Sequence, residues 1–235
     1  FGKEIACAPG KPEKNNSNNN EQLICEAEKQ DKGMDTSNTS NDTEAKEVKE
    51  RYPFLDMDNP RFPIKAALSQ PRGGTVRHDA VAWGYARGAD SLGVDIIQKC
   101  EVTGFVRDGD AVVGVETNRG RISAGRVGIC VAGHSGHVAG LAGLKLPVES
   151  QTLQAMVTEG VKPMINSVIM SQSLHCYISQ SDKGGLVFGG DLDFYASYAQ
   201  RGNMPMMEHV MEAGMTLMPM IGKAKVLRSW GVIMD

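Results

Sequence analysis

The order of turns and apolar runs between Gly73 and Gly133 limits the fold more than any other feature of this 235-residue chain. The stretch GGTVRHDAVAWGYARGADSLGVDII begins with two glycines, continues with a helical pattern and ends in a β-branched run. Two glycine-containing turns and a strongly apolar run follow it. A helix, a buried strand and a β-excursion in this order are typical of an α/β fold with an antiparallel side sheet.

The first predicted helix covers residues 79–92. Asp79 can cap its start by accepting a hydrogen bond from a backbone N–H two or three residues on. Gly93 suits the left-handed position that often follows a helix, and the β-branched run 94–98 is predicted as a short buried strand. Four residues at helical spacing predict one apolar face, namely Val81, Tyr85, Ala89 and Leu92.

Residues 100–133 are predicted as three successive strands, CEVTGFVR, AVVGVETN and RISAGRVGICVAG. The turns between them are Asp-Gly-Asp at 108–110 and Arg-Gly at 119–120, which contain residues that tolerate a positive φ. The third run, 121–133, is strongly apolar. We therefore expect a β-meander whose last strand ends at Gly133.

After Pro147 the pattern changes to alternating runs, which predict an antiparallel sheet. A methionine-rich helix is predicted over 206–217 and a further strand over 225–235. The alternating runs are 152–159, 175–180 and 185–191. We therefore predict a first domain over 47–150 and a second, mostly antiparallel α+β domain over 151–235.

Six methionines lie between residues 204 and 218. Thioethers can bind copper(I), but a methionine run is more often an adaptable packing surface. Four of them fall on one helical face, which favours packing, namely Met207, Met211, Met215 and Met218.

Residues 1–46 are rich in Asn, Ser, Thr and charged side chains and poor in large apolar ones. A segment of this composition cannot bury enough apolar surface to offset the entropy lost on ordering. We therefore expect residues 1–46 to be a disordered tail or linker.

The composition of the chain argues against several kinds of partner. A net charge of −3 gives no basic field to attract nucleic acid or an anionic membrane. No apolar run approaches the ~20 residues that span a bilayer. The five cysteines lie far apart without a CxxC pair, which predicts free thiols and no zinc site. We expect a cytoplasmic protein without a bound metal.

Three features allow both a functional and a structural interpretation. The Gly73-Gly74 turn resembles an anion cradle, but its spacing is not GxGxxG and a plain loop-to-helix turn explains it better. His78 is either bonded to a backbone carbonyl or is a nucleophile or ligand, because the neighbouring Arg77 and a helix N-terminus favour neutral imidazole. His134 and His137 form an HxxH pair without a third metal ligand, so a loop after a strand is favoured.

The segment 70–105, QPRGGTVRHDAVAWGYARGADSLGVDIIQKCEVTGF, resembles the β subunits of heterotetrameric sarcosine oxidases. These are D-amino-acid-oxidase-like FAD-dependent oxidoreductases. The similarity covers residues 48–235 and includes GRVGICVAGHSG, LPVESQTLQAMVTE, YISQSDKGGLVFGG, YAQRG and VLRSWG. The resemblance implies part of an FAD-binding Rossmann-like domain with a β-meander over 47–150, followed by part of a substrate domain over 151–235.

The resemblance assigns the main cofactor role to His78. In that family the histidine of the RHD motif carries a covalent FMN, attached through the 8α-methyl group of the flavin. A rigid turn that fixes the imidazole against this methyl group removes much of the entropy cost of bond formation. Arg77 matches a basic position beside the flavin, where a cation stabilises the anionic reduced form. Arg77 and His78 are therefore the implied catalytic residues, and Thr75 joins the cofactor site as part of the same motif.

The family also binds a second, noncovalent FAD. Val102 matches a strand residue whose backbone pairs with the adenine edge, and Gly133 and His134 match a strand end that passes near the FAD. The GxGxxG segment that holds the FAD pyrophosphate in the family has no counterpart in this sequence. The sequence also ends at Asp235, ahead of the position of the family's flavin-site lysine. We therefore expect a partial subunit.

The resemblance implies flavin-dependent oxidation of sarcosine to glycine. Electrons pass from FAD through FMN to oxygen, which gives peroxide, and tetrahydrofolate captures the one-carbon unit as methylenetetrahydrofolate. The implied partner is the α subunit of a heterotetramer, which also holds NAD. Two alternatives stay open: an FAD-only amine or amino-acid dehydrogenase of the same superfamily, and a noncatalytic subunit that keeps the fold without flavin.

Overall fold

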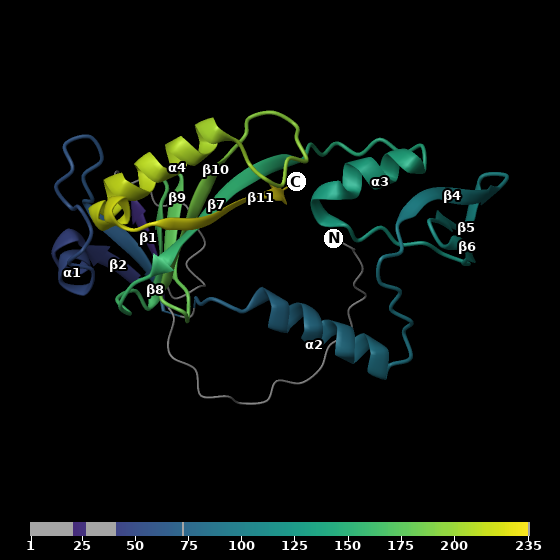
Figure 1. The fold of residues 1–235 in the computed structure, drawn as a ribbon, viewed down its shortest axis with the longest axis horizontal. Helices are drawn as coiled ribbons and strands as arrows, with labels where there is room; N and C mark the ends of the chain where they lie inside the picture. Colours follow the sequence, from purple (N-terminus) through teal and green to yellow (C-terminus); the bar gives the residue numbers. More distant parts are fainter. Residues whose placement is uncertain (1–20, 27–40, 72, 235) are drawn as a thin grey trace. The chain divides into compact units, whose positions relative to one another are not determined.

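The computed structural model describes residues 21–26, 41–71 and 73–234. The chain divides into two compact units, and each is described by itself (Figure 1). The "meander unit" contains residues 76–151 and 233–234, and the "sheet unit" contains 152–232 with the described residues up to 75.

This division differs in part from the one predicted from the sequence. The change of unit between residues 151 and 152 lies beside the predicted domain boundary at 150. Residues 47–75, however, were expected in the first domain and group with the sheet unit instead. The physical reason is strand pairing, because Ala66–Gln70 joins the large sheet, antiparallel to two of its strands.

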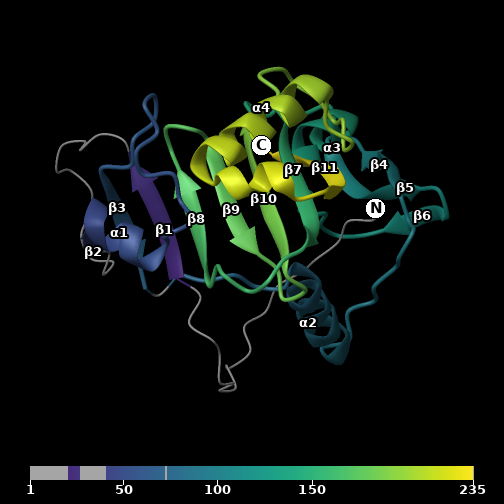
Figure 2. The same cartoon turned by 60° about the vertical axis from the view of Figure 1, so that its left-hand side comes forward.

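The sheet unit is built on one sheet of mainly antiparallel strands (Figure 2). Its order is β11-β7-β10-β9-β8-β1-β3-β2. The strands are β1 (Glu21–Glu26), β2 (Asn41–Glu44), β3 (Ala66–Gln70), β7 (Gln151–Gly160), β8 (Ser167–Ser171), β9 (Cys176–Gln180), β10 (Gly185–Leu192) and β11 (Val226–Met234). β1 and β8 run parallel, whereas β8, β9, β10 and β7 pair successively in antiparallel fashion.

The predicted strands of the second half are confirmed. The runs 152–159, 175–180, 185–191 and 225–235 correspond to β7, β9, β10 and β11. Every second residue of β8 is buried, and in β9 the same alternation holds from Cys176 to Ile178. This alternation is what a strand produces when one of its faces packs on a core.

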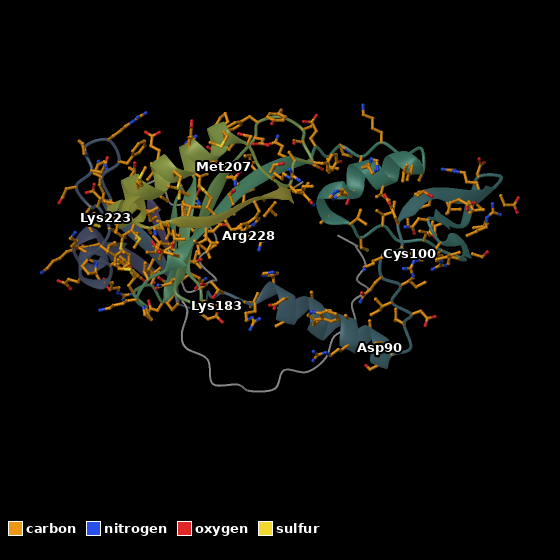
Figure 3. The ribbon with its side chains drawn as sticks, viewed as in Figure 1. Asp90, Cys100, Lys183, Met207, Lys223 and Arg228 are labelled. Atoms are coloured by element: carbon orange, nitrogen blue, oxygen red, sulfur yellow. The ribbon has the colours of Figure 1, made fainter. Side chains whose placement is uncertain are left out.

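The methionine-rich helix is also confirmed, as α4 (Met204–Leu217), which lies across the sheet beside β9 and β10 (Figures 1 and 2). Asn203 caps it, because its Oδ1 accepts a hydrogen bond from the Met206 backbone N–H at 2.9 Å. Met207, labelled in Figure 3, and Met211 pack against the core, and Met218 is fully buried. These contacts support the packing interpretation for Met207, Met211 and Met218, but not for Met215, which is 38% exposed.

The core of the sheet unit lies between this sheet and the helices that cover it. Its largest fully buried side chains include Phe188 and Ile178 from the sheet and Leu217 from α4. Each such side chain contributes about 1.5–3 kcal/mol by leaving water. A short helix, α1 (Ala45–Arg51), buries Val48 in the same core.

The expected disorder of residues 1–46 is wrong at the described positions, because 21–26 and 41–44 form β1 and β2. The remaining positions, 1–20 and 27–40, lie outside the described residues. β1 is hydrogen-bonded to β3 on one side and to β8 on the other. Strands distant in the sequence therefore supply the backbone hydrogen-bond partners of β1. Local composition cannot predict such long-range pairing.

The meander unit contains the predicted helix and the predicted hairpins. Its elements are α2 (His78–Ser91), β4 (Val102–Asp108), β5 (Ala111–Thr117), β6 (Gly120–Ser123), the 3-10 helix η1 (Ala132–His134) and α3 (Ser135–Leu141). The three strands form an antiparallel sheet in the order β4-β5-β6. Gly93 follows α2 with a φ of +82°, as predicted for a helix end.

Two predicted buried strands of this unit are wrong. Residues 94–98 form no strand, and of the run 121–133 only the residues up to Ser123 are paired, in β6. The side chains of Ile96 and Ile97 are each 40% exposed. Extended apolar segments become strands when neighbouring strands pair with them, and the described residues of this unit provide no such neighbour. The predicted apolar face of α2 is likewise exposed, and none of the helix's residues is buried.

Candidate functional site

The turn from Arg77 to Asp79 forms the start of α2. Arg77 is the N-cap residue, with an extended backbone, and no side chain caps the helix. The predicted cap by Asp79 is wrong, because Asp79 Oδ1 accepts a hydrogen bond from the adjacent Ala80 N–H at 2.9 Å instead of one further along the helix. Asp79 also pairs with Arg77, whose Nη2 lies 2.8 Å from Oδ2 and whose Nε lies 3.3 Å from Oδ1.

The ion pair between Arg77 and Asp79 determines the electrostatics of this turn. The hydrogen bond from Arg77, with a smaller contribution from the Ala80 N–H, lowers the pKa of Asp79 below its usual 3.8. A two-point contact between a guanidinium and a carboxylate is stronger than a neutral capping bond, which explains why the aspartate turns towards Arg77. The Arg77 side chain is still 72% exposed, so its charge is held at the helix start without being buried.

His78 is the first residue of α2, and its side chain is exposed. An exposed imidazole can bond to a planar electrophile without first opening the protein. Thr75 is also exposed but belongs to the sheet unit, because the division falls between Thr75 and Val76. Of the predicted site residues around this turn, Arg77 and His78 lie together with Asp79 at the start of α2, and Thr75 does not belong to the same unit.

Gly133 is buried in η1, at a point where two backbone segments approach closely. An added Cβ would lie 2.9 Å from the Ile233 carbonyl oxygen, so no larger residue fits. The hydroxyl of the buried Ser150 donates a hydrogen bond to the Gly133 carbonyl. Ala132, one residue earlier, has a φ of +43°, which is unusual for a residue with a side chain. These contacts fix the backbone at the position where the sequence predicts an FAD contact.

Val102 is the first residue of β4, where it pairs with Thr117. The HxxH pair is not in a loop as predicted, because His134 ends η1 and His137 lies within α3. Ser135 starts that helix, and its hydroxyl donates to the Ala132 carbonyl at 2.6 Å. Within the part of the chain that the structure describes, no group of three or more His, Cys, Asp or Glu side chains is placed to hold a metal ion.

Sequence reasoning missed two residues of this region. Asp79 was assigned to capping, although its spacing of two from Arg77 in the RHD motif was a visible signal for an ion pair. Ser150 gave no signal, because it is 17 residues from the Gly133 carbonyl that it contacts. Tertiary contacts of this kind follow from the fold and not from local sequence.

Comparison with known proteins gives independent information about the family of this chain. A family model described as "FAD dependent oxidoreductase" matches residues 25–235 of the chain. The chain belongs to the FAD-dependent oxidoreductase family. Its similarity to the curated sarcosine oxidase β subunit of Rhizobium meliloti is 61% identity over 188 residues, which is 80% of this chain and 45% of that protein. For the β subunit of Rhodobacter capsulatus it is 50% over 192 residues, or 82% and 46% of the two chains.

The chain therefore spans about half the length of the curated relatives that it matches. Its fold resembles the crystal structure of L-proline dehydrogenase from P. horikoshii, with a TM-score of 0.79 and 21% identity. That match covers 92% of this chain and 60% of the other. It confirms the expected α/β flavoprotein fold, including its antiparallel sheet. No helix within the described residues is long and apolar enough to cross a membrane.

Proposed function

We propose that this chain is the flavin-attaching part of a sarcosine oxidase β subunit. The observation that carries the proposal is the RGGTVRHD motif, with an exposed His78 at a helix start, in a chain 61% identical to a sarcosine oxidase β subunit. Identity at this level extends over most of the chain. It supports a common reaction class more strongly than the fold alone does.

His78 would hold the FMN covalently, through a bond between one imidazole nitrogen and the flavin 8α-methyl group. Arg77 would supply positive charge next to the flavin, and its ion pair with Asp79 would hold the guanidinium in place. Thr75, which belongs to the same sequence motif, stays a predicted cofactor-binding residue. When bound, the flavins supply the redox chemistry, accepting two electrons from the amine and returning them to oxygen.

A second, noncovalent FAD would lie near Val102, Gly133 and His134. Gly133 lets the backbone of Ile233 approach closely, and this contact would fix the strand end beside the FAD. Ser150 would act as a positioning residue, since its hydroxyl holds the Gly133 carbonyl.

The complete enzyme would oxidise sarcosine to glycine and release peroxide, with tetrahydrofolate taking up the one-carbon unit. An α subunit that holds NAD would complete the heterotetramer. The word "subunit" in the names of the relatives supports a multichain assembly. The cytoplasmic location expected from the sequence stays a prediction.

The test is acid-stable flavin on the chain co-produced with its companion subunit. We expect yellow fluorescence to remain with the chain after acid denaturation, and the peptide containing His78 to carry the added mass of FMN. The variant His78→Ala should lose both signals. His137→Ala is the matched control, because His137 is another exposed histidine of the same unit, and it should keep both.

The other functional hypotheses predict different results. An FAD-only amine or amino-acid dehydrogenase would release all its flavin in acid while still oxidising an amine. A noncatalytic subunit would show neither flavin nor activity. Acid-stable flavin that survives in His78→Ala would contradict the assigned attachment site.

A further inference from the structure

Three buried oxygen atoms of the sheet unit have no hydrogen-bond partner, namely Thr152 Oγ1, Gln154 Oε1 and Asp193 Oδ2. The three residues are 1%, 1% and 5% exposed. A buried acceptor without a donor costs about 1–3 kcal/mol, and native proteins usually satisfy such atoms with a water molecule or an ion. A fourth atom of this kind, Gln70 Oε1, lies on β3, which four strands separate from β7.

The three residues are neighbours. Thr152 and Gln154 are two positions apart on β7, so their side chains lie on the same face of the strand. The Asp193 backbone N–H donates to the Thr152 carbonyl oxygen at 3.1 Å. On its other side, Asp193 Oδ1 accepts a short hydrogen bond from the Asn203 side-chain amide.

The backbones of two glycines lie close to Gln154 and Thr152. Gly202, next to Asn203, has a φ of +70°, and an added Cβ would overlap the Gln154 Oε1 atom. Gly231 of β11 lies against Thr152, and an added Cβ there would be 3.1 Å from the Gly202 backbone nitrogen. Gln154 Nε2 is already used, because it donates to the Trp230 carbonyl at 3.0 Å. The backbone therefore packs closely around the three oxygens, which argues for a small occupant.

Charge distinguishes between these two occupants. A water molecule would supply protons to the unpaired oxygens but would leave the Asp193 carboxylate without a counter-charge. Among the residues that the structure describes, no Lys, Arg or His forms an ion pair with Asp193. Burying an uncompensated carboxylate costs far more than burying a neutral polar group. A cation satisfies both the charge and the acceptors.

The donor set also indicates which cation. All three atoms are oxygens, whereas zinc and copper prefer nitrogen or sulfur ligands. Calcium takes six to eight oxygen ligands, usually with more than one carboxylate. One carboxylate with one amide oxygen and one hydroxyl oxygen suits a single positive charge.

We propose that Thr152, Gln154 and Asp193 bind one monovalent alkali cation, Na⁺ or K⁺, which ties β7 and the end of β10 to the loop before α4. This site lies wholly within the sheet unit and does not rest on the proposed flavin chemistry. The cation would thereby help to hold the segment from Asp193 to Asn203, which leads into α4.

Thermal unfolding of the chain in different chlorides at equal ionic strength tests the proposal. We expect the Tm in NaCl or KCl to exceed that in choline chloride by about 5 °C, with saturation as the cation concentration rises. Asp193→Asn should remove the difference between salts. Asp191→Asn is the matched control, because Asp191 is also buried but has His209 as a partner at 3.3 Å, and it should retain the difference.

Crystals grown in rubidium chloride provide a second measurement that needs no variant. An anomalous difference peak within coordination distance of the three oxygens is the expected result. Equal Tm values of the unmodified chain in all chlorides, or a water molecule without an anomalous peak at this position, would overturn the proposal.

Discussion

Gly202→Ala is expected to destabilise the sheet unit by about 3–5 kcal/mol. Gly202 has a φ of +70°, where a residue with a Cβ loses about 1–2 kcal/mol. The new Cβ would also lie 2.7 Å from Gln154 Cδ and 3.0 Å from its Nε2, which is too close for either atom to stay. The backbone strain alone is therefore only part of the cost.

The remaining cost comes from moving the Gln154 amide. Its Nε2 donates to the Trp230 carbonyl at 3.0 Å and to the Ala155 carbonyl at 3.2 Å. Each hydrogen bond contributes about 1 kcal/mol, and a buried amide that loses its partners costs more than that. Two such bonds add about 2–3 kcal/mol to the strain.

Gly143→Ala is the matched control for the strain. Gly143 has a φ of +72°, and no atom lies within 4 Å of an added Cβ. This variant should lose only about 1–2 kcal/mol. A second control is Gly202→Ala in a Gln154→Ala background, where the obstructing amide is absent and the cost of the glycine change should fall to the same 1–2 kcal/mol.

Urea unfolding measures these differences. In a Trp83→Phe background the only tryptophan is Trp230, which lies in the sheet unit, so its fluorescence reports unfolding of that unit. Gly143→Ala, in the meander unit, is followed by circular dichroism. Equal losses for Gly202→Ala and Gly143→Ala, or an unchanged cost of Gly202→Ala when Gln154 is alanine, would refute the reasoning.

Two further predictions concern the sheet unit. Gln180→Leu should lower the free energy of unfolding by about 2–3 kcal/mol in urea titrations, because the Gln180 amide accepts from the Met164 and Ile165 N–H groups and donates to the Lys162 and Gly184 carbonyls. An unchanged unfolding midpoint would contradict this. Burial raises the pKa of the Cys176 thiol to about 12, from 9.0. Since only the unfolded chain then releases this proton, stability should fall between about pH 9 and 12, and Cys176→Ala should flatten the decline in pH-dependent urea titrations. A decline of the same slope in that variant would assign the effect to other groups, such as Tyr177.

The elements that the sequence predicted well are those with one face packed on the core and the other face towards solvent. β9 and α4 each present one face to the core, so alternation and helical spacing identify them. β8 was missed because its sequence, SVIMS, has three consecutive apolar residues and so lacks an alternation of apolar and polar residues. β1 and β2 were missed because their pairing partners lie far along the chain.

Some residues of the candidate sites could be predicted from the sequence, and others could not. The prediction of His78 as an attachment site rests on resemblance alone, since no local physical rule distinguishes an attachment site from an ordinary helix start. The role of Asp79 was misassigned because a charged partner competes with the helix for the carboxylate. The cluster of Thr152, Gln154 and Asp193 was invisible in the sequence, because two strands and a loop bring it together.

The proposed flavin attachment at His78 and the proposed FAD site would have different structural requirements. The turn carrying His78 is fully formed in the described structure, with its ion pair and the first turn of α2 in place. Residues 94–98, by contrast, have the composition of a buried strand but no neighbouring strand to pair with. The proposed attachment would depend mainly on the local turn, whereas the proposed FAD site at Val102 and Gly133 would depend on the sheet around them. Attachment at His78 should therefore survive changes that abolish FAD binding, and the two cofactors can be tested separately.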